Sequence, residues 1–266
     1  MKKKRYSLYL ILPLIIILLI NIFAIYAYGL NVNEDDSAKY DRVYVSKVID
    51  GDTFKTSSGT KVRLIGLDTP EISYNKKKDN EYFSQKARQF LKEKIENKYV
   101  YLDYDLELKD EYDRILAYVF LGNGEFINAS LLENGYARLL AIAPNLCYLS
   151  FFREISKEAI KGQKGMWGKT PIINYTEAKQ YIGKEVIIRG RVIDIYDSGD
   201  VIFINFNPEY WKSFSALIFE YTKNKFNYNP IEELENKEVL ILGVIKKYKS
   251  TTEIIIDDPV QIIIME

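Results

Sequence analysis

Two segments in the first half of the chain place carboxylates and an arginine at the ends of predicted strands. Residues 50–53 read Asp-Gly-Asp-Thr, and residues 63–71 begin with arginine and end in Asp-Thr-Pro-Glu. Because side chains alternate along a strand, Asp50 and Asp52 are expected on one face. Clustered carboxylates repel one another unless a cation lies between them. The pattern is therefore suited to a hard divalent metal such as calcium or magnesium.

Each segment taken alone has an ordinary structural interpretation. Asp-Gly-Asp is typical of a hairpin turn, and Asp-Thr-Pro is typical of turn initiation. A third segment, residues 110–114, reads Asp-Glu-Tyr-Asp-Arg and places Arg114 just before a predicted strand. A single arginine there would be an ordinary surface charge. Only the combination of the three segments indicates a shared site.

The composition excludes several classes of chemistry. The 266 residues contain no histidine and one cysteine, Cys147. Catalysis by imidazole, zinc bound by histidine and an intrachain disulfide are therefore excluded. The 37 basic and 37 acidic residues balance, so bulk positive charge cannot drive binding to a polyanion. We expect Cys147 to be a small apolar residue in core packing.

Residues 41–168 are expected to form the first folded unit. Short runs of alternating hydrophobicity bounded by turn residues predict strands. Apolar residues at helical spacing, ended by glycine in two cases, predict helices. The expected strands are 43–48, 53–56, 61–67, 99–108 and 115–121, and the expected helices are 81–96, 128–134 and 151–161.

A linker at 169–175 and a second unit at 176–266 are expected to follow. Thr176 is expected to cap a small helix over 177–182, and a short helix is expected at 231–234. The expected strands are 185–196, 201–206, 216–220, 238–248 and 253–256, with 260–264 completing the last one. Five strands with a helix between the third and fourth is the order of an OB barrel.

The N-terminal residues 1–30 are expected to be a membrane anchor, followed by a tether at 31–40. Four basic residues precede an uncharged stretch of 28 residues, 6–33. That length spans a bilayer core, and the preceding basic cluster predicts a cytoplasmic N-terminus with the rest outside. The alternative is a signal cleaved after the small residues Ala27 or Gly29, which would release a secreted protein.

In this order, D-G-D-T, R-L-x-x-x-D-T-P-E and D-x-Y-x-R resemble the staphylococcal nuclease (thermonuclease) family. The resemblance extends from Val43 to Trp167 and includes Ile127-Asn128 and Gly165-Met166-Trp167. It implies a mainly β fold with helices (α+β), in which an OB-like five-stranded nuclease barrel carries three helices. The second unit resembles an OB-fold domain, so the expected order is a transmembrane helix, the nuclease barrel and a second OB barrel.

The resemblance also implies a metal site. Asp52 and Asp68 would bind Ca²⁺ together with the backbone carbonyl of Thr69. Asp50 would lie just outside this ligand set and support it.

The resemblance further implies roles in catalysis. Glu71 would position or deprotonate the attacking water, and Arg63 and Arg114 would bind the scissile phosphate. Three more side chains are expected to contact the substrate: Tyr112, Lys76 and Lys77. Members of the family carry tyrosines beside the bound nucleotide where this chain has Ala141 and Ala143, so weaker base stacking is expected.

The implied function is that of a calcium-dependent endonuclease, which we expect to be a monomer displayed outside the cytoplasmic membrane. Its substrate would be DNA, RNA or both, cut to 3′-phosphate ends. The alternatives are a non-catalytic nucleic-acid-binding module and a receptor for DNA uptake, both retaining the nuclease fold. All five polar residues of the implied site are present, which favours the enzyme.

The second unit carries a weaker signal for nucleic acid. Five aromatic side chains could stack on the bases of a single strand: Phe203, Phe206, Tyr210, Trp211 and Phe214. Residues 169–266 contain 12 basic and 15 acidic residues, a net charge of −3. This charge is unfavourable for a phosphate-binding groove, so a spacer or a protein-contact module is an equal alternative.

Overall fold

The computed structural model describes residues 40–72, 81–209 and 212–265. The expected anchor and nearly all of the tether lie outside these residues, as do Lys76, Lys77, Tyr210 and Trp211. Within the described ranges, no helix has the length and apolar character needed to cross a membrane.

The first unit is a closed barrel in the order β1-β2-β3-β6-β5. Its strands are β1 (Asp41–Val48), β2 (Thr53–Thr56), β3 (Lys61–Leu64), β5 (Tyr99–Asp103) and β6 (Ile115–Leu121). β3 and β6 are parallel, and the other pairs are antiparallel. The first half of β1 pairs with β5 and its second half with β2, with a register shift between Val45 and Lys47. Such irregularities bend a strand, which allows β1 to close the barrel.

Three helices pack on this barrel: α2 (Ser84–Ile95), α3 (Ile127–Glu133) and α4 (Leu149–Lys161). α2 buries Ala87, Leu91 and Ile95, which share one helix face because they are spaced four residues apart. The expected barrel with three helices is thus confirmed for this unit, and helix boundaries differ from the expected ones by a few residues. An apolar core fills the barrel and the space under the helices, with Phe54, Tyr118 and Phe152 among its largest buried side chains.

Asn128 fastens α3 to the barrel. It is fully buried; its side-chain oxygen accepts a hydrogen bond from the backbone N–H of Val119 at 2.9 Å, and its amide nitrogen donates to the carbonyl of Ile65 at 2.9 Å. A buried amide without partners would be costly, so this asparagine fixes α3 against both β6 and the segment after β3.

The expected strand over 61–67 breaks at Gly66. β3 ends at Leu64, and the chain turns into β4 (Leu67–Asp68), which pairs with β7 (Arg138–Leu139). Gly66 has φ +83°, and a Cβ at this position would lie 2.5 Å from the ring of Phe152. Glycine is needed here both for the left-handed backbone and for the close approach of α4.

We therefore predict that Gly66→Ala lowers the free energy of unfolding much more than Gly59→Ala does. Gly59 also has positive φ, but a Cβ there would meet only Lys55 Cε, at 3.7 Å. Backbone strain alone costs about 1–2 kcal/mol. Displacing the Phe152 ring adds about 1–3 kcal/mol more. Urea unfolding followed by circular dichroism measures both variants, and equal losses would contradict this account.

Two other expectations in the first unit are wrong. The strand from Tyr99 ends at Asp103 instead of Leu108, and the next turn is held by Asp105. The Asp105 carboxylate accepts hydrogen bonds from the Tyr118 hydroxyl at 2.9 Å and from the backbone N–H of Cys147 at 3.0 Å. Cys147 itself is exposed and is not part of the core. Its backbone is held at the surface by this bond, so its side chain does not reach the packing between barrel and helices.

The second unit contains two sheets instead of one closed barrel. The five-stranded sheet has the order β10-β11-β12-β15-β14, and the four-stranded sheet has the order β16-β13-β9-β8. The strands are β8 (Ile172–Asn174), β9 (Glu185–Arg191), β10 (Asp194–Asp197), β11 (Val201–Asn205), β12 (Phe214–Phe219), β13 (Glu238–Val244), β14 (Lys246–Tyr248), β15 (Thr251–Ile256) and β16 (Ile262–Ile264). Short helices α5 (Glu220–Lys223) and α6 (Pro230–Leu234) separate β12 from β13. Two neighbouring strands of the larger sheet, β12 and β15, are parallel, as β3 and β6 are in the first barrel.

Several details of the second unit differ from expectation. Part of the expected linker, Ile172–Asn174, is β8 and pairs in parallel with β9. Asn174, instead of Thr176, caps the following 3₁₀ helix, Tyr175–Tyr181. Segment 260–264 does not extend β15: a 3₁₀ turn, Pro259–Gln261, leads into β16, which pairs with β13. The Asp258 side chain caps this turn and so redirects the chain.

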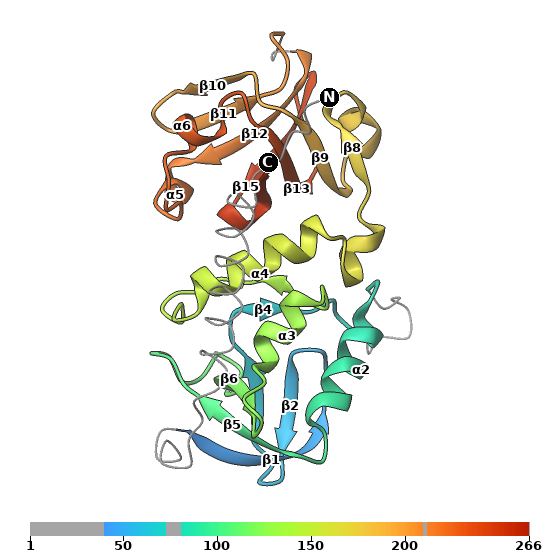
Figure 1. Ribbon diagram of the computed structural model, residues 1–266, viewed down its shortest axis with the longest axis vertical. Coiled ribbons are helices and arrows are strands. Elements are labelled where there is room, and N and C mark those ends of the chain that lie inside the picture. Colours follow the sequence, from blue (N-terminus) through green and yellow to red (C-terminus); the bar gives the residue numbers. More distant parts are fainter. Residues whose placement is uncertain (1–39, 73–80, 210–211, 266) are drawn as a thin grey trace, which may run out of the picture.

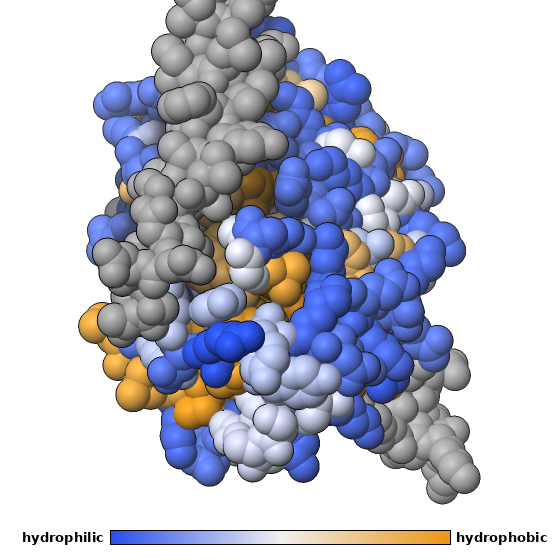
Figure 2. Space-filling model, turned by 60° about the horizontal axis from the view of Figure 1, so that its bottom comes forward, coloured by the Kyte–Doolittle hydropathy of each residue, from blue (hydrophilic) through white to orange (hydrophobic). Residues whose placement is uncertain are grey.

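The two units are joined through α4 and the four-stranded sheet (Figure 1). Apolar side chains from both units form one buried cluster, with members Ala159, Ile160, Met166, Trp167, Ile187, Leu240, Leu242, Val260 and Ile263. Arg153 on α4 forms a two-bond ion pair with Asp258, at 3.1 and 2.9 Å, and both side chains are largely buried. The junction is therefore packed and paired. At the opposite end of the molecule, the surface is mainly hydrophilic with apolar residues gathered toward one edge (Figure 2).

Candidate active site

Asp50 and Asp52 lie in the loop between β1 and β2, not on one face of a strand as expected. The backbone N–H groups of Ile49 and Asp50 both donate to the carbonyl of Thr53, at 2.9 and 3.0 Å, which closes a tight turn. Gly51 in this turn touches Thr69: a Cβ on Gly51 would lie 2.7 Å from Thr69 Oγ1. Because glycine has no side chain, the loop that carries Asp50 and Asp52 can pack directly against the segment that carries Asp68 and Thr69.

Arg63 links the carboxylates of the two segments. Its Nη1 donates to Asp52 Oδ2 at 2.5 Å, and its Nη2 donates to Asp68 Oδ1 at 2.9 Å. Asp52 is 3% exposed, and the Arg63 side chain is 14% exposed. Burial opposes the charge of Arg63, but Asp52 and Asp68 raise the pKa of its guanidinium. In this structure Arg63 is the cation between the two expected metal ligands.

The β4–β7 pair positions Asp68 and Thr69. Asp68 lies directly opposite Arg138, and Leu67 lies opposite Leu139. Thr69 follows at the end of β4 and is 2% exposed. Pro70 comes next, so the chain leaves the strand in an extended path toward Glu71.

Glu71 is exposed at the edge of this group of carboxylates. Desolvation by the surrounding protein, and then the charges of Asp50, Asp52 and Asp68, raise the pKa of Glu71. Burial, reinforced by the charge of Asp52, likewise raises the pKa of Asp50. The four carboxylates are therefore close enough to repel one another. Arg63 does not fully offset this repulsion, because the pKa values of Asp50 and Glu71 remain raised.

Arg114 is presented by a turn that Asp110 organises. The Asp110 carboxylate accepts hydrogen bonds from Arg114 Nε at 2.6 Å, from the Arg114 backbone N–H at 3.0 Å and from the Tyr112 backbone N–H at 2.9 Å. Burial works against the charge of Asp110, but the hydrogen bonds from Arg114 lower its pKa. Sequence reasoning gave no role to Asp110, although its spacing of four residues from Arg114 is typical of a charge pair.

One open cavity of about 650 Å³ brings the expected catalytic side chains together. It is lined by Arg63, Glu71 and Arg114, and by Tyr112, whose side chain is largely exposed. Asp52 and Asp68 border it through their bonds to Arg63. Aliphatic side chains such as Leu140 and Ile142 form another wall, on the segment where the family tyrosines are replaced. Parallel pairing of β3 with β6 carries the two arginines to the same side of the barrel.

The residues of the site fit a divalent metal, although the described ranges hold no group of three or more His, Cys, Asp or Glu side chains arranged for one. Two carboxylates, Asp52 and Asp68, converge on a single cation, and the pKa values of Asp50 and Glu71 are raised beside them. Oxygen ligands of this kind suit calcium or magnesium. A cation at this place would relieve the repulsion.

Known proteins similar to this chain match its first unit. The family model described as staphylococcal nuclease homologue matches residues 61–169. A thermonuclease from Staphylococcus intermedius is 40% identical over 126 residues, which are 46% of this chain and 74% of that protein. The chain belongs to the staphylococcal nuclease family.

Other relatives in this family bear names of the same kind. A thermonuclease from Staphylococcus hyicus is 37% identical over 126 residues, 46% of this chain and 73% of that protein. Endonuclease YncB from Bacillus subtilis is 32% identical over 140 residues, 50% of this chain and 64% of that protein. The family assignment thus supports a nuclease function and a nucleic-acid substrate. The match to the family model ends at residue 169, before the second unit.

Proposed function

We propose that this protein is a calcium-dependent endonuclease that cuts DNA, RNA or both and leaves 3′-phosphate ends. The observation that carries the proposal is one cavity in which Arg63, Arg114 and Glu71 meet, with Arg63 tied to Asp52 and Asp68. This set supplies what phosphodiester hydrolysis requires, namely positive charge around the phosphate and a carboxylate base. The family membership supports the same reaction class.

The chain's own residues divide the work as follows. Arg63 and Arg114 donate hydrogen bonds to the non-bridging oxygens of the phosphate, whose charge grows as water adds to phosphorus. Glu71 accepts a proton from that water. The bond between phosphorus and the 5′-oxygen breaks, the 5′-oxygen takes up a proton from solvent water, and the phosphate stays on the 3′-oxygen. Arginine suits the two phosphate-binding places because its fork is planar and always charged.

Asp52, Asp68 and the Thr69 carbonyl are the groups that would hold Ca²⁺, with Asp50 beside them. Bound there, the ion would supply Lewis-acid stabilisation of a phosphate oxygen. Asp52 and Asp68 currently bind Arg63, so a cation between them would leave the Arg63 guanidinium available to the phosphate.

The function is tested by incubating the full chain with single-stranded DNA, duplex DNA and RNA, in Ca²⁺, in Mg²⁺ and in chelator. We expect cleavage in Ca²⁺, none in chelator, and products that carry 3′-phosphates. Intact nucleic acid under every condition, from a chain shown to be folded by circular dichroism, would overturn the enzyme. Tight DNA binding in chelator without any cleavage in Ca²⁺ would instead support the binding or uptake module.

We predict that Ca²⁺ stabilises the folded chain through Asp68. A ligand that binds only the folded state at 100 times its dissociation constant adds about 2.7 kcal/mol of stability. Addition of Ca²⁺ to chelator-treated protein should therefore raise the melting temperature, and Asp68→Asn should remove this increase. Asp113→Asn is the matched control, because Asp113 is exposed and pairs only with Lys109 in the described structure. An equal increase in both variants would contradict the assignment.

We propose further that the N-terminal segment, 6–30, anchors the protein in the membrane with the units at 41–168 and 176–266 outside, or is cleaved to release them.

The strand order of the second unit supports an OB-like fold for it. Of its expected stacking aromatics, Phe206 and Phe214 are buried in the core and are not available to bases. Phe203 pairs with the exposed Tyr196 on the other face of its sheet.

A further inference from the structure

A second cavity, of about 350 Å³, lies where the two units meet. The first unit contributes Pro70, Glu81, Tyr82 and Arg138, the connecting segment contributes Lys169, and β9 contributes Glu185. Its volume falls within the lower part of the range for small-ligand sites, which begins at about 300 Å³. None of these residues has a role in the reaction described above.

This junction cavity begins beside the active site. Pro70 lies between Thr69 and Glu71 in the chain. Arg138 is the direct partner of Asp68 in the β4–β7 pair, and directly paired side chains lie on the same face. Glu71 of the active-site cavity and Pro70 of the junction cavity are consecutive in the chain, so the two cavities have neighbouring walls.

The lining of the cavity suits a nucleotide. The Tyr82 side chain is 49% exposed, and Lys169 Nζ lies 4.6 Å from the centre of its ring. An exposed aromatic ring stacks on any base, and an adjacent ammonium neutralises a phosphate. Of the two carboxylates in the lining, Glu185 is neutralised by Arg138, whose Nη2 donates to Glu185 Oε2 at 2.8 Å. The other, Glu81, accepts a hydrogen bond from the backbone N–H of Glu71 at 3.2 Å.

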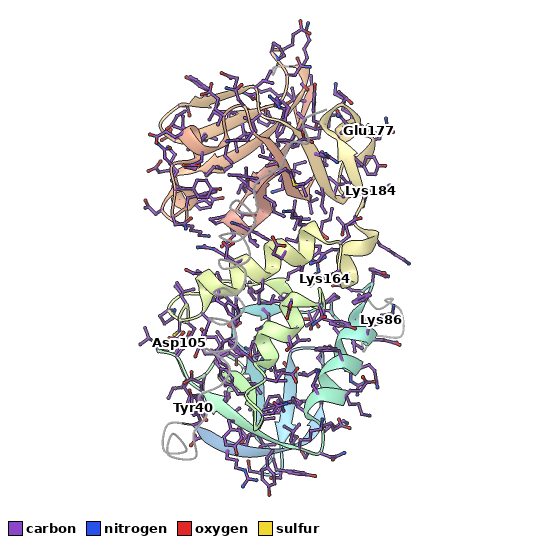
Figure 3. The ribbon with its side chains drawn as sticks, in the orientation of Figure 1. Tyr40, Lys86, Asp105, Lys164, Glu177 and Lys184 are labelled. Atoms are coloured by element: carbon purple, nitrogen blue, oxygen red, sulfur yellow. The ribbon has the colours of Figure 1, made fainter. Side chains whose placement is uncertain are left out.

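The surroundings of the cavity are basic. Lys86, Lys164 and Lys184 are exposed, and like Lys169 they form no ion pair within the described ranges. Figure 3 shows Lys86 on the first unit and Lys184 on the second unit, toward the same side of the molecule and on either side of the junction. The lining itself carries two basic and two acidic side chains, Arg138, Lys169, Glu81 and Glu185, so it is these three surrounding lysines that make the local charge favourable for a polyanion.

The cavity is also preformed. Glu185 is carried by the second unit, whose position is fixed by the Arg153–Asp258 ion pair and by the apolar cluster at the junction. Binding there needs no docking step, so little ordering free energy is lost.

We propose that the junction cavity binds one further nucleotide of a single-stranded substrate, with its base on Tyr82 and its phosphate at Lys169. The proposal rests on the proposed nuclease function and extends it to a subsite built jointly by both units. The nuclease is then selective for strands long enough to reach the junction. The second unit takes part in substrate binding through Glu185, which lines the cavity.

Binding as a function of strand length tests the proposal. The full chain carrying Glu71→Gln, in Ca²⁺, is titrated with fluorescent single-stranded DNA of two, four, eight and sixteen nucleotides, and anisotropy gives each Kd. Tyr82→Ala and Lys169→Gln are added separately. Tyr99→Ala is the matched control, because Tyr99 is 50% exposed, lies on β5 of the barrel and has a cation over its ring as Tyr82 does, with Arg42 Cζ 3.8 Å from the ring centre.

We expect Tyr82→Ala to weaken binding of the longer strands by about tenfold and to leave the dinucleotide unchanged. Lys169→Gln should also reduce the salt dependence of binding by about one phosphate contact. Tyr99→Ala should change neither. Length profiles identical to that of the parent would overturn the subsite, even if the wild-type chain cleaves DNA. Cleavage by the wild-type chain is measured in parallel. No cleavage of any substrate would overturn the nuclease function, whereas the length profiles test the subsite itself.

Discussion

Glu71→Gln is expected to lower the rate of DNA cleavage in Ca²⁺ by about 10²- to 10⁴-fold, the usual contribution of a general base. Glutamine has nearly the same shape but cannot accept a proton from water. The Glu71 carboxylate lines the cavity that holds Arg63 and Arg114, and burial together with the nearby carboxylates raises its pKa, which favours proton uptake. The measurement is single-turnover cleavage of a labelled oligonucleotide at saturating enzyme.

Glu111→Gln provides the control for this loss. Glu111 lines the same cavity and is exposed, and no side-chain hydrogen bond or ion pair of Glu111 is present within the described structure. Its replacement removes one negative charge near the phosphate, so the rate should stay the same or rise. If both variants lost activity equally, local charge instead of proton transfer would explain the effect.

Arg114→Ala is expected to lower the rate by about 10²- to 10³-fold, comparable to the loss of one transition-state donor in other enzymes. The reason is that Arg114 is held in place by Asp110 and directed into the cavity that also contains Arg63. Arg114→Lys should recover only part of the rate, because lysine keeps the charge but lacks the planar fork. Comparing kcat with KM separates the two effects, since a transition-state donor changes kcat more than KM.

Arg189→Ala is the matched control for Arg114→Ala. Arg189 is also an ion-paired arginine, with Glu238 at 2.7 Å, but it lies on β9 of the second unit. Its replacement should leave the rate unchanged. A change of less than threefold in Arg114→Ala, with the fold retained by circular dichroism, would remove Arg114 from the proposed mechanism.

The second unit is ion-paired to the first beside the β4–β7 strand pair. Two ion pairs, Arg153–Asp258 and Arg138–Glu185, cross the junction, and the second of them begins opposite Asp68. Glu185 of the second unit and Arg138 of β7 therefore line one cavity.

Local patterns predicted most elements of the first unit. β2 and β6 begin and end where alternation of apolar residues placed them, and α2 follows its apolar stripe. These elements depend on neighbouring residues, whose spacing is visible in the chain. The family resemblance was carried by short polar motifs, and the structure brings Arg63, Glu71 and Arg114 into one cavity as those motifs imply.

The sequence-based predictions were wrong where contacts between residues far apart in the chain determine the position of a side chain. Asp50 and Asp52 lie in a loop because Gly51 packs against Thr69, eighteen positions further along the chain. Cys147 is exposed because Asp105 holds its backbone at the surface. Phe206 and Phe214 are core residues because the sheet turns their side chains inward, a choice that aromatic composition does not reveal.

The sequence by itself determined the barrel strands, the three helices and the residue types for phosphodiester chemistry, because periodicity and motif spacing are properties of neighbouring residues. Only the tertiary structure decided that Arg63 bridges Asp52 and Asp68, and that Tyr82, Lys169 and Glu185 share a cavity. These groups are far apart in the chain or lie in different units. Their proximity is fixed by barrel closure and by packing at the junction, which no local pattern encodes.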